Sequence, residues 1–527
     1  TGAVIGSTLY FGPLSIVSIG LAAPVGLFWY QGLKDMKQHR HTIRRNFPVI
    51  GNIRYLFESI RPEIRQYFIE SDDFAHPFSR ADRSVAYQRA KAMTDTLPFG
   101  TRKNVYETGY EWVNHSIWPT TVPKENERIM IGGPDCKQPY SAALLNISAM
   151  SYGALSDHAI LALNTGAKMG GFYHNTGEGG ISRFHLQPGG DIVWNVGTGY
   201  FGCRTEEGEF CEEMFQKNAT RKQVKMIEIK LSQGAKPAHG GILPAKKVTK
   251  NIAEARGLHR LDQDCVSPPV HSAFEGALGL IQFVARLREL SGGKPVGWKM
   301  CVGRPDEFAA ICHAMLETGI TPDFITIDGA EGGTGAAPPE FSNRVGTPLT
   351  EGMGLVDSML VGAGLRDRIK IISAGKIITG FQLVRQLALG ADICNSARGM
   401  MFALGCIQAL KCNTNTCPSG VATQDEELQK GLHVGNKSYR VMQFQQKTVH
   451  AALELIGAVG LDHPDKLSAD HIVRRIGALK VSPYSKLYRQ APAGSLLEGT
   501  GPTLLQGWWD NGKALLERQK KDQTNRV

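Results

Sequence analysis

Short apolar runs recur along the middle of the chain and predict the strands of a parallel sheet. Each run is rich in β-branched residues and ends in a loop of Gly, Ser or Asn, and several are followed by residues with helical spacing. The candidate strands are 144–149, 171–175, 191–196, 225–231, 296–302, 324–328, 369–374 and 391–396. The candidate helices between them are 156–169, 272–290, 305–318, 352–365 and 380–389. Eight strands that alternate with helices predict an α/β fold, the (β/α)8 TIM barrel, with a doubly wound sheet as the alternative.

A second apolar pattern, without charge, covers residues 9–30. Twenty-two helical residues rise about 33 Å, which is enough to cross the core of a bilayer. Aromatic residues stand near both ends of the run, and six basic side chains follow it between residues 34 and 54. The positive-inside rule therefore predicts a single-pass membrane anchor, with the later chain on the cytoplasmic side. A cleaved signal peptide and a buried core helix are the alternatives.

These patterns divide the chain into four predicted parts. They are an anchor at 1–31, a helical and irregular collar at 32–135, a barrel at 136–430 and a C-terminal helical extension at 431–527. Within the collar, residues 61–70 have the spacing of an amphipathic helix.

Composition narrows the classes of function. Of the 527 residues, 42% are hydrophobic and 20% are charged, which excludes disorder as the main state. The net charge of +10 fits an anionic substrate, an acidic partner, a nucleic acid or an anionic membrane. We expect no nucleic-acid binding, because no basic and aromatic module can be recognised.

Glycine-rich loops follow the predicted strands, and in a (β/α)8 barrel this is where the chemistry takes place. They are 150–156, 175–180, 197–202, 232–241, 328–338 and 374–380. Clustered glycines let backbone N–H groups approach a ligand closely. Gly375, Lys376, Gly380 and the turn at 397–399 are candidates for a phosphate site. The run GTGYFG at 197–202 matches a dinucleotide-binding pattern, but no helix-forming stretch begins there, so we do not interpret it as a nicotinamide site.

Three cysteines crowd together after the last predicted strand. Cys406, Cys412 and Cys417 have the spacing C-x5-C-x4-C, which allows three thiolates to converge on one metal centre. Three local ligands favour a three-iron over a four-iron cluster, and the paired arms of a zinc site are absent. Buried structural thiols are the alternative.

Six stretches carry a resemblance to a known family. They are NISAMSYGALS, GGFYHNTGEGG, IEIKLSQGAKPAHGGILPAKKV, FITIDGAEGGTGAAP, SAGKIITG and ALGCIQALKCNTNTCPSGVATQ. They resemble the FMN-binding synthase domain of the glutamate synthase family, in its short form without a glutamine amidotransferase domain. The resemblance implies a (β/α)8 barrel, FMN, a [3Fe–4S] cluster and the reductive conversion of 2-oxoglutarate to glutamate. Without an amidotransferase domain, we expect free ammonium or an amine delivered by another subunit.

The resemblance also implies roles for individual residues. Cys406, Cys412 and Cys417 match the cluster ligands. We expect Glu178 and Lys299 to be catalytic, and Lys236 and Arg183 to bind substrate. The residues expected to bind FMN are Ser148, Met150, Ser151, Asn175, Gln233, Lys299, Gly329, Gly332, Gly333, Gly375, Lys376, Gly380, Ala397 and Arg398. Lys299 would stabilise the anionic reduced flavin, and Glu178 would relay a proton or orient the imine. An ordinary ion pair for Lys299 and a loop-bonding carboxylate for Glu178 are the alternatives.

The electron source and the wider assembly are a separate question. No nicotinamide-binding domain can be recognised, so we expect electrons from ferredoxin or a similar external carrier. The alternative function is a flavin and iron–sulfur electron-transfer subunit of a larger membrane complex, without 2-oxoglutarate chemistry. A scaffold protein would be distinguished by the absence of bound flavin.

Overall fold

The computed structural model describes residues 1–258, 260–488 and 490–524. The chain divides into two compact units, 1–81 and 82–527. The finer divisions predicted at residues 31, 135 and 430 stay predictions.

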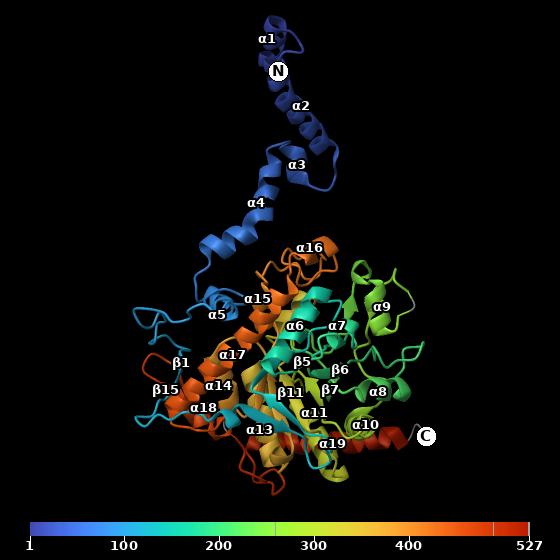
Figure 1. Cartoon of the computed structure of the whole chain (residues 1–527), viewed down its shortest axis with the longest axis vertical. Helices are drawn as coiled ribbons and strands as arrows, with labels where there is room; N and C mark the ends of the chain where they lie inside the picture. The colour runs from blue at the N-terminus through green and yellow to red at the C-terminus, as the bar shows by residue number, and fades with distance from the viewer. Residues whose placement is uncertain (259, 489, 525–527) are drawn as a thin grey trace. The chain divides into compact units, whose positions relative to one another are not determined.

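Eight parallel strands close into a barrel in the second unit (Figure 1). In barrel order they are β4 (Leu145–Ile147), β5 (His174–Asn175), β6 (Ile192–Val196), β7 (Val224–Lys230), β10 (Val296–Met300), β11 (Phe324–Asp328), β12 (Lys370–Ala374) and β13 (Ile393–Ser396). Each lies within or overlaps a predicted strand, so the predicted barrel is confirmed and the doubly wound alternative is wrong. The strands are buried along nearly their whole length, because helices cover the outside and side chains fill the inside.

Helices follow most barrel strands, and C-terminal helices add to the outer layer. They are α6 (Asp157–Gly170), α7 (Arg183–Leu186), α8 (Glu212–Ala219), α9 (Lys250–Arg256), α10 (Gly276–Leu290), α11 (Pro305–Thr318), α12 (Pro339–Arg344), α13 (Leu349–Gly362), α14 (Gly380–Ala388), α15 (Arg398–Leu404), α16 (Glu426–Lys430), α17 (Val434–Val459), α18 (Tyr484–Leu487) and α19 (Thr503–Thr524). The long α17 packs on α6, α14 and α15, and α19 packs on α11 and α10. The five predicted helices correspond to α6, α10, α11, α13 and α14.

Three small antiparallel sheets lie outside the barrel. One contains β1 (Glu111–Val113), β14 (Ile472–Arg475) and β15 (Val481–Pro483). The others pair β2 (Arg128–Ile131) with β3 (Tyr140–Ala143), and β8 (Ile242–Leu243) with β9 (Cys265–Val266). The first sheet joins the segment before the barrel to the C-terminal segment.

The first unit consists of helices, and its apolar segment is interrupted. It contains α1 (Gly2–Phe11), α2 (Ile16–Lys37), α3 (Thr42–Asn46), α4 (Gly51–Ile64) and a π-helical turn at Arg65–Ile69. The helix α5 (Arg80–Ala90) follows. The prediction of one continuous helix over 9–30 is therefore wrong: Gly12 has a positive φ of 84°, Pro13 lacks an N–H donor, and Ser15 caps a new helix by accepting from Ser18 N at 3.1 Å.

The helix α2 is long and apolar enough to cross a membrane, with a mean hydropathy of 1.4 in its most apolar window. That criterion rests on length and composition, and a signal sequence near an N-terminus satisfies it too. Only 6% of the window is buried, which disfavours the alternative of a buried core helix.

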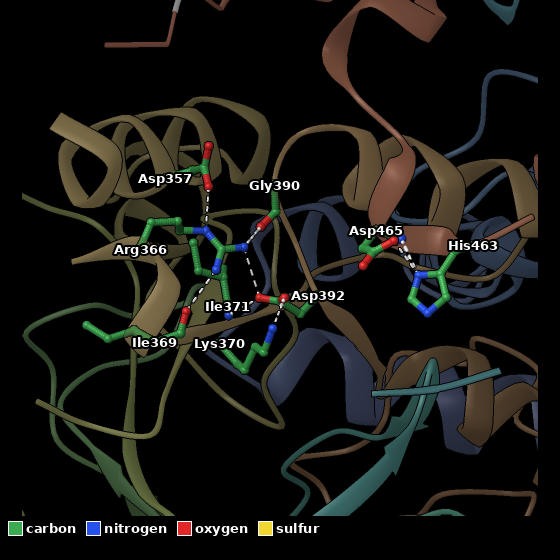
Figure 2. A network of polar contacts seen from close by, with 9 residues as sticks. All are labelled: Asp357, Arg366, Ile369, Lys370, Ile371, Gly390, Asp392, His463 and Asp465. Carbon is green, nitrogen blue, oxygen red and sulfur yellow. Dashed lines mark hydrogen bonds and ion pairs between the residues drawn. The ribbon is translucent and has the colours of Figure 1, made fainter. Parts of the chain in front are cut away.

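A network of charged groups ties together the amino ends of two barrel strands (Figure 2). The Arg366 guanidinium donates to Asp357 at 2.8 Å and to Asp392 at 2.9 Å. Asp392 also accepts from Lys370 at 3.1 Å and from the backbone N–H of Ile371 at 2.7 Å. The network joins α13 to the starts of β12 and β13, at the end of the barrel associated with stability rather than chemistry.

Candidate active site

A close ion pair lies at the opposite, carboxyl end of the barrel. Glu178, in the loop after β5, accepts from the ammonium group of Lys230, the last residue of β7, at 2.5 Å. Two glycines border this carboxylate: a Cβ atom on Gly197 would lie 2.9 Å from Glu178 Cβ, and one on Gly241 would lie 3.1 Å from Glu178 Oε1. Both loops therefore need glycine to surround Glu178 so closely.

Neighbouring cations control the ionisation of Glu178. Burial alone would raise the pKa of its carboxyl group, but Lys230, Arg256 and Lys236 lower the pKa to about 2. Burial in turn lowers the pKa of Lys230 and of Lys236. The Glu178 carboxylate is therefore ionised at neutral pH and is surrounded by cationic groups.

Two further lysines at this end of the barrel have no hydrogen-bond or ion-pair partner among the residues that the structure describes. Lys236 is 6% exposed and Lys299 is 5% exposed. Lys299, on β10, lies in register with Lys230 on one side and with Thr326 on the other. Neither ammonium group makes a hydrogen bond or an ion pair with any residue that the structure describes. Because an unpaired buried cation is costly, this arrangement favours an anionic ligand at the carboxyl end of the barrel.

A second carboxylate, Glu228, lies on β7 two residues before Lys230. Glu228, on β7 and 1% exposed, accepts from Asn175 at 2.8 Å, from Asn195 at 2.7 Å and from Thr326 at 2.7 Å. Asn175 also accepts from the backbone N–H of Gly177 at 3.0 Å. Asn175, predicted to contact the cofactor, thus connects the barrel interior to the loop that carries Glu178.

The loops after β7 and β11 are pressed against each other. A Cβ atom on Gly234 would lie only 1.7 Å from the carbonyl oxygen of Gly329, and Asp328 accepts from the backbone N–H of Gly234 at 3.1 Å. Burial raises the pKa of Asp328. Gln233 donates to Thr334 in the same pair of loops at 3.4 Å. The predicted residues Gln233 and Gly329 are therefore brought together, at a contact that only glycine permits.

The predicted phosphate site contains two cations near each other. Arg398 donates to the carbonyl oxygen of Glu331 at 2.7 Å, and a Cβ atom on Gly333 would lie 2.8 Å from Arg398 Nε. Burial lowers the pKa of Arg398 to about 10 and also lowers the pKa of Lys376, which Arg398 depresses further. Gly375 and Lys376 both have positive φ, and Gly380 is the first residue of α14. These positions form a cationic loop cluster, as an anion site requires.

The other predicted site residues differ in where they lie. Ser148 follows β4, and a Cβ atom on Gly177 would lie 2.5 Å from the backbone nitrogen of Ser151, so the loop of Met150 and Ser151 faces the Glu178 loop. By contrast, Arg183 is exposed on α7, with its guanidinium 4.8 Å from the ring centroid of Phe184. The cations that act on Glu178 do not include Arg183.

Sequence reasoning missed the residues that hold Lys230 in place. The carbonyl oxygen of Lys230 lies 2.9 Å from His271 Nε2, and His271 Nδ1 lies 3.0 Å from the hydroxyl of Tyr200. A carbonyl can only accept, so Nε2 carries the proton and the Tyr200 hydroxyl donates to Nδ1. Tyr200 in turn accepts from the N–H of Ala273 at 3.0 Å. Lys230 itself could have been found from strand alternation, because it is two residues after Glu228.

The three predicted metal ligands lie in one loop after α15, but they do not form a metal site as they stand. Among the described residues, no group of three or more His, Cys, Asp or Glu side chains is placed to hold a metal ion. Burial raises the pKa of Cys406 to about 12 and raises that of Cys412. Burial would also raise the pKa of Cys417, but hydrogen bonds from Ser419 and backbone N–H groups lower it below its ordinary value.

The cysteine loop is fastened to the rest of the barrel by backbone carbonyls. Tyr87 donates to the carbonyl oxygen of Cys406 at 2.6 Å. The buried ammonium of Lys247 donates to the carbonyl oxygens of Cys412 at 3.0 Å, Ala154 at 3.3 Å and Ala422 at 3.1 Å. Lys247 thus links the cysteine loop to the loop after β4.

Taken together, the fold and the site define a (β/α)8 barrel protein with buried lysines at the carboxyl ends of its strands. Residues 121–462 match the family model described as the conserved region in glutamate synthase. The chain belongs to the glutamate synthase family, as the resemblance in its sequence predicted.

Curated relatives extend this match beyond the barrel. The chain is 38% identical to the glutamate synthase large subunit-like protein YerD of Bacillus subtilis (strain 168), over 86% of this chain and 94% of that protein. It is 35% identical to the archaeal glutamate synthase [NADPH] of Methanocaldococcus jannaschii, and 33% identical to the archaeal-type glutamate synthase [NADPH] of Thermotoga neapolitana. Each of these two matches covers 61% of this chain and 60% of the relative.

Proposed function

We propose that the protein is a flavin-dependent oxidoreductase that converts 2-oxoglutarate to glutamate, with nitrogen from ammonium or a delivered amine. The observation that carries this proposal is a pair of buried ammonium groups without a partner among the described residues: Lys236, which acts on the ionised Glu178, and Lys299, which lies in register with Lys230. A dicarboxylate and an anionic cofactor are the ligands that such cations favour. Membership of the glutamate synthase family supports this choice among anionic ligands.

The carboxyl end of the barrel fits FMN. Lys376 and Arg398 would hold the phosphate, together with Gly375, Gly380 and Ala397. The flavin ring would lie against the loops after β4, β7 and β11, and the residues proposed for it are Ser148, Met150, Ser151, Asn175, Gln233, Gly329, Gly332 and Gly333. When bound and reduced by the external donor, the flavin would supply a hydride to the carbon that becomes Cα of glutamate. The Lys299 ammonium would neutralise negative charge on the flavin ring.

The low pKa of Glu178 supports one of the two roles considered for it. A carboxyl group with a pKa of about 2 holds no proton at neutral pH, so it is a poor proton donor. We therefore assign Glu178 to orient the substrate nitrogen by accepting its hydrogen bond. Lys236 would bind a substrate carboxylate. The geometry favours Lys236 over the exposed Arg183 for this task.

We propose that Cys406, Cys412 and Cys417 hold a [3Fe–4S] cluster, which supplies one-electron transfer when bound. The donor set fits such a centre: three thiols lie in one loop, and the N–H of Gln408 already donates to the sulfur of Cys406 at 3.4 Å. N–H donors to the sulfurs are among the features that tune cluster potentials.

The electron donor and the location are part of the same proposal. We propose ferredoxin or a similar external carrier as the electron donor. Two relatives are named for NADPH, so NADPH should be tested as the alternative donor. We propose α2 as a single-pass anchor, with the basic residues after it on the cytoplasmic side. The apolar α2 also favours the second candidate function, an electron-transfer subunit of a membrane complex.

An anaerobic half-reaction tests the proposal. The purified full chain would be reduced with dithionite, the excess removed, and flavin absorbance followed after addition of 2-oxoglutarate and ammonium, with controls that omit each compound. We expect reoxidation only with both compounds, and one glutamate formed per flavin. A flavin that stays reduced would contradict ammonium-dependent synthesis and favour the electron-transfer subunit. Parallel reductions with ferredoxin and with NADPH would identify the donor.

A further inference from the structure

A continuous stripe of apolar side chains is exposed along α4. Ile53, Leu56, Phe57, Ile60 and Ile64 recur at intervals of three and four residues, which places them on one face of the helix. Their exposed fractions are 50%, 56%, 60%, 37% and 38%. A soluble helix normally buries such a face against a core, and here no described residue of the first unit covers it.

The charges on α4 itself balance, with Arg54 and Arg61 against Glu58 and Glu63. The basic excess of this unit lies mainly before the helix, where residues 31–50 contain five Lys and Arg side chains and one Asp. Between residues 31 and 69 there are eight Lys and Arg side chains but only three Asp and Glu. An apolar helix face that follows a basic segment fits a helix lying in the interface of an anionic bilayer.

Hydrogen bonds fasten the start of α4 to the end of α2. Asp35, near the end of α2, accepts from the backbone N–H of Val49 at 2.9 Å and from the side chains of Asn52 at 2.5 Å and Gln31 at 2.8 Å. Asp35 is 2% exposed, so these bonds are shielded from water. They hold the first turn of α4 beside the end of the helix that is long and apolar enough to span a membrane. Figure 1 shows α2, α3 and α4 in succession along this unit.

We propose that α4 is an interfacial helix whose stripe of Ile53, Leu56, Phe57, Ile60 and Ile64 is immersed in the surface of an anionic lipid bilayer. Lipid is favoured over a protein partner by the excess of basic residues and by the attachment of α4 to the candidate span. The chain would then cross the bilayer in α2 and run along its surface in α4. This inference rests on the proposed membrane anchor α2 but not on the proposed chemistry of the barrel.

Two neighbouring positions give a matched test in the full chain. An environment-sensitive fluorescent amino acid would replace Phe57 on the stripe or Glu58, which is exposed on the polar side. Each protein would be reconstituted in phosphatidylcholine vesicles with and without phosphatidylglycerol. Emission would be measured with brominated lipids as a quencher in the membrane and with iodide as a quencher in water. Far-UV circular dichroism and gel filtration would show that both proteins are folded.

We expect the label at position 57 to emit at shorter wavelength in the anionic vesicles, to be quenched by brominated lipid and to be shielded from iodide. The label at position 58 should stay accessible to iodide. Equal access of iodide to both labels would overturn the proposal. So would a label at 57 that is shielded from iodide but unaffected by brominated lipid, because a protein surface would then cover the stripe.

Discussion

The two ends of the barrel differ in whether their charged side chains have partners among the described residues. At the amino end, Arg366 is bonded to Asp357 and Asp392, and Arg288 donates to Asp323 at 3.1 and 3.0 Å. At the carboxyl end, Lys236 and Lys299 are as deeply buried, yet within the described chain their ammonium groups have no partner. The amino end thus has charged groups that are paired within the protein, whereas the carboxyl end also has two buried lysines that favour an anionic ligand.

We therefore expect charges at the amino end to affect stability and charges at the carboxyl end to affect ligand binding. A charge network that is complete within the protein contributes to the free energy of unfolding and has no capacity for a ligand. Cations left without partners reduce that free energy until an anion binds. We therefore expect variants at the amino end to change stability while turnover per folded molecule is kept, and variants at the carboxyl end to do the reverse.

The largest effect is expected at the amino end, for Arg366→Met. The substitution leaves the buried carboxylate of Asp357 without a cation and Asp392 with Lys370 alone, and breaking such a buried pair costs about 3–5 kcal/mol. Urea unfolding followed by circular dichroism would measure the loss. Lys370→Met is the matched control, because it removes only a partly exposed partner of Asp392 and should cost less than about 1 kcal/mol. Equal losses for the two variants would contradict the central place given to Arg366.

At the carboxyl end, Glu178→Gln should reduce turnover by about 100-fold, the cost of a misoriented reactant. The amide keeps the size of the side chain but loses the negative charge that faces Lys230 and Lys236. Steady-state glutamate formation with flavin content measured in the same sample would show this. Glu213→Gln, at an exposed position of α8, should leave turnover unchanged. Wild-type turnover in Glu178→Gln would assign Glu178 to loop structure alone.

Lys299→Met sharpens the comparison by removing a cation that makes no hydrogen bond or ion pair with the described residues, although its charge acts on Asp328. We expect FMN to bind roughly tenfold more weakly, since a hydrogen bond to a charged group contributes about 1.5–3 kcal/mol. The free energy of unfolding of the flavin-free protein should not fall, in contrast to Arg366→Met. Fluorescence titration of the flavin-free protein with FMN would measure the affinity. A stability loss without a change in FMN affinity would assign Lys299 a structural role in the barrel instead of a role in cofactor binding.

The barrel could be predicted because its determinants are local. Each strand is a short apolar run followed by glycine, so every one of the eight predicted strands contains residues of an observed strand. The break in the N-terminal helix is also local, but an apolar run with a proline does not by itself predict a break, because membrane helices tolerate proline. The helix instead ends at Phe11, where Gly12 takes a positive φ.

The electrostatics of the site could not be predicted in the same way. Glu178 is 52 residues from Lys230, and His271 is 41 residues beyond Lys230. Strand alternation predicts that Glu228 and Lys230 share a face, but not which loop residue meets them. Nor does any local pattern distinguish a lysine with a partner from one without, as the contrast between Lys230 and Lys299 shows.

The smallest effect concerns His271, which touches Lys230 only through a backbone carbonyl. Burial lowers the pKa of His271 to about 4, whereas an unfolded histidine titrates near 6.5. Between these values the unfolded chain binds a proton that the folded chain does not, so the protein loses stability as the pH falls from about 6.5 to about 4. His271→Gln removes this contribution, and the decline should be shallower by at most about 1.4 kcal/mol per pH unit.

Urea unfolding across this pH range would measure it, with His450→Gln at an exposed position of α17 as control. His174 and His185, whose pKa values are also lowered by burial, remain in both proteins and cancel in the comparison. Identical slopes for wild type and His271→Gln would show that His271 takes up its proton in the folded state, and the hydrogen-bond chain from Tyr200 to Lys230 would then not depend on a neutral imidazole.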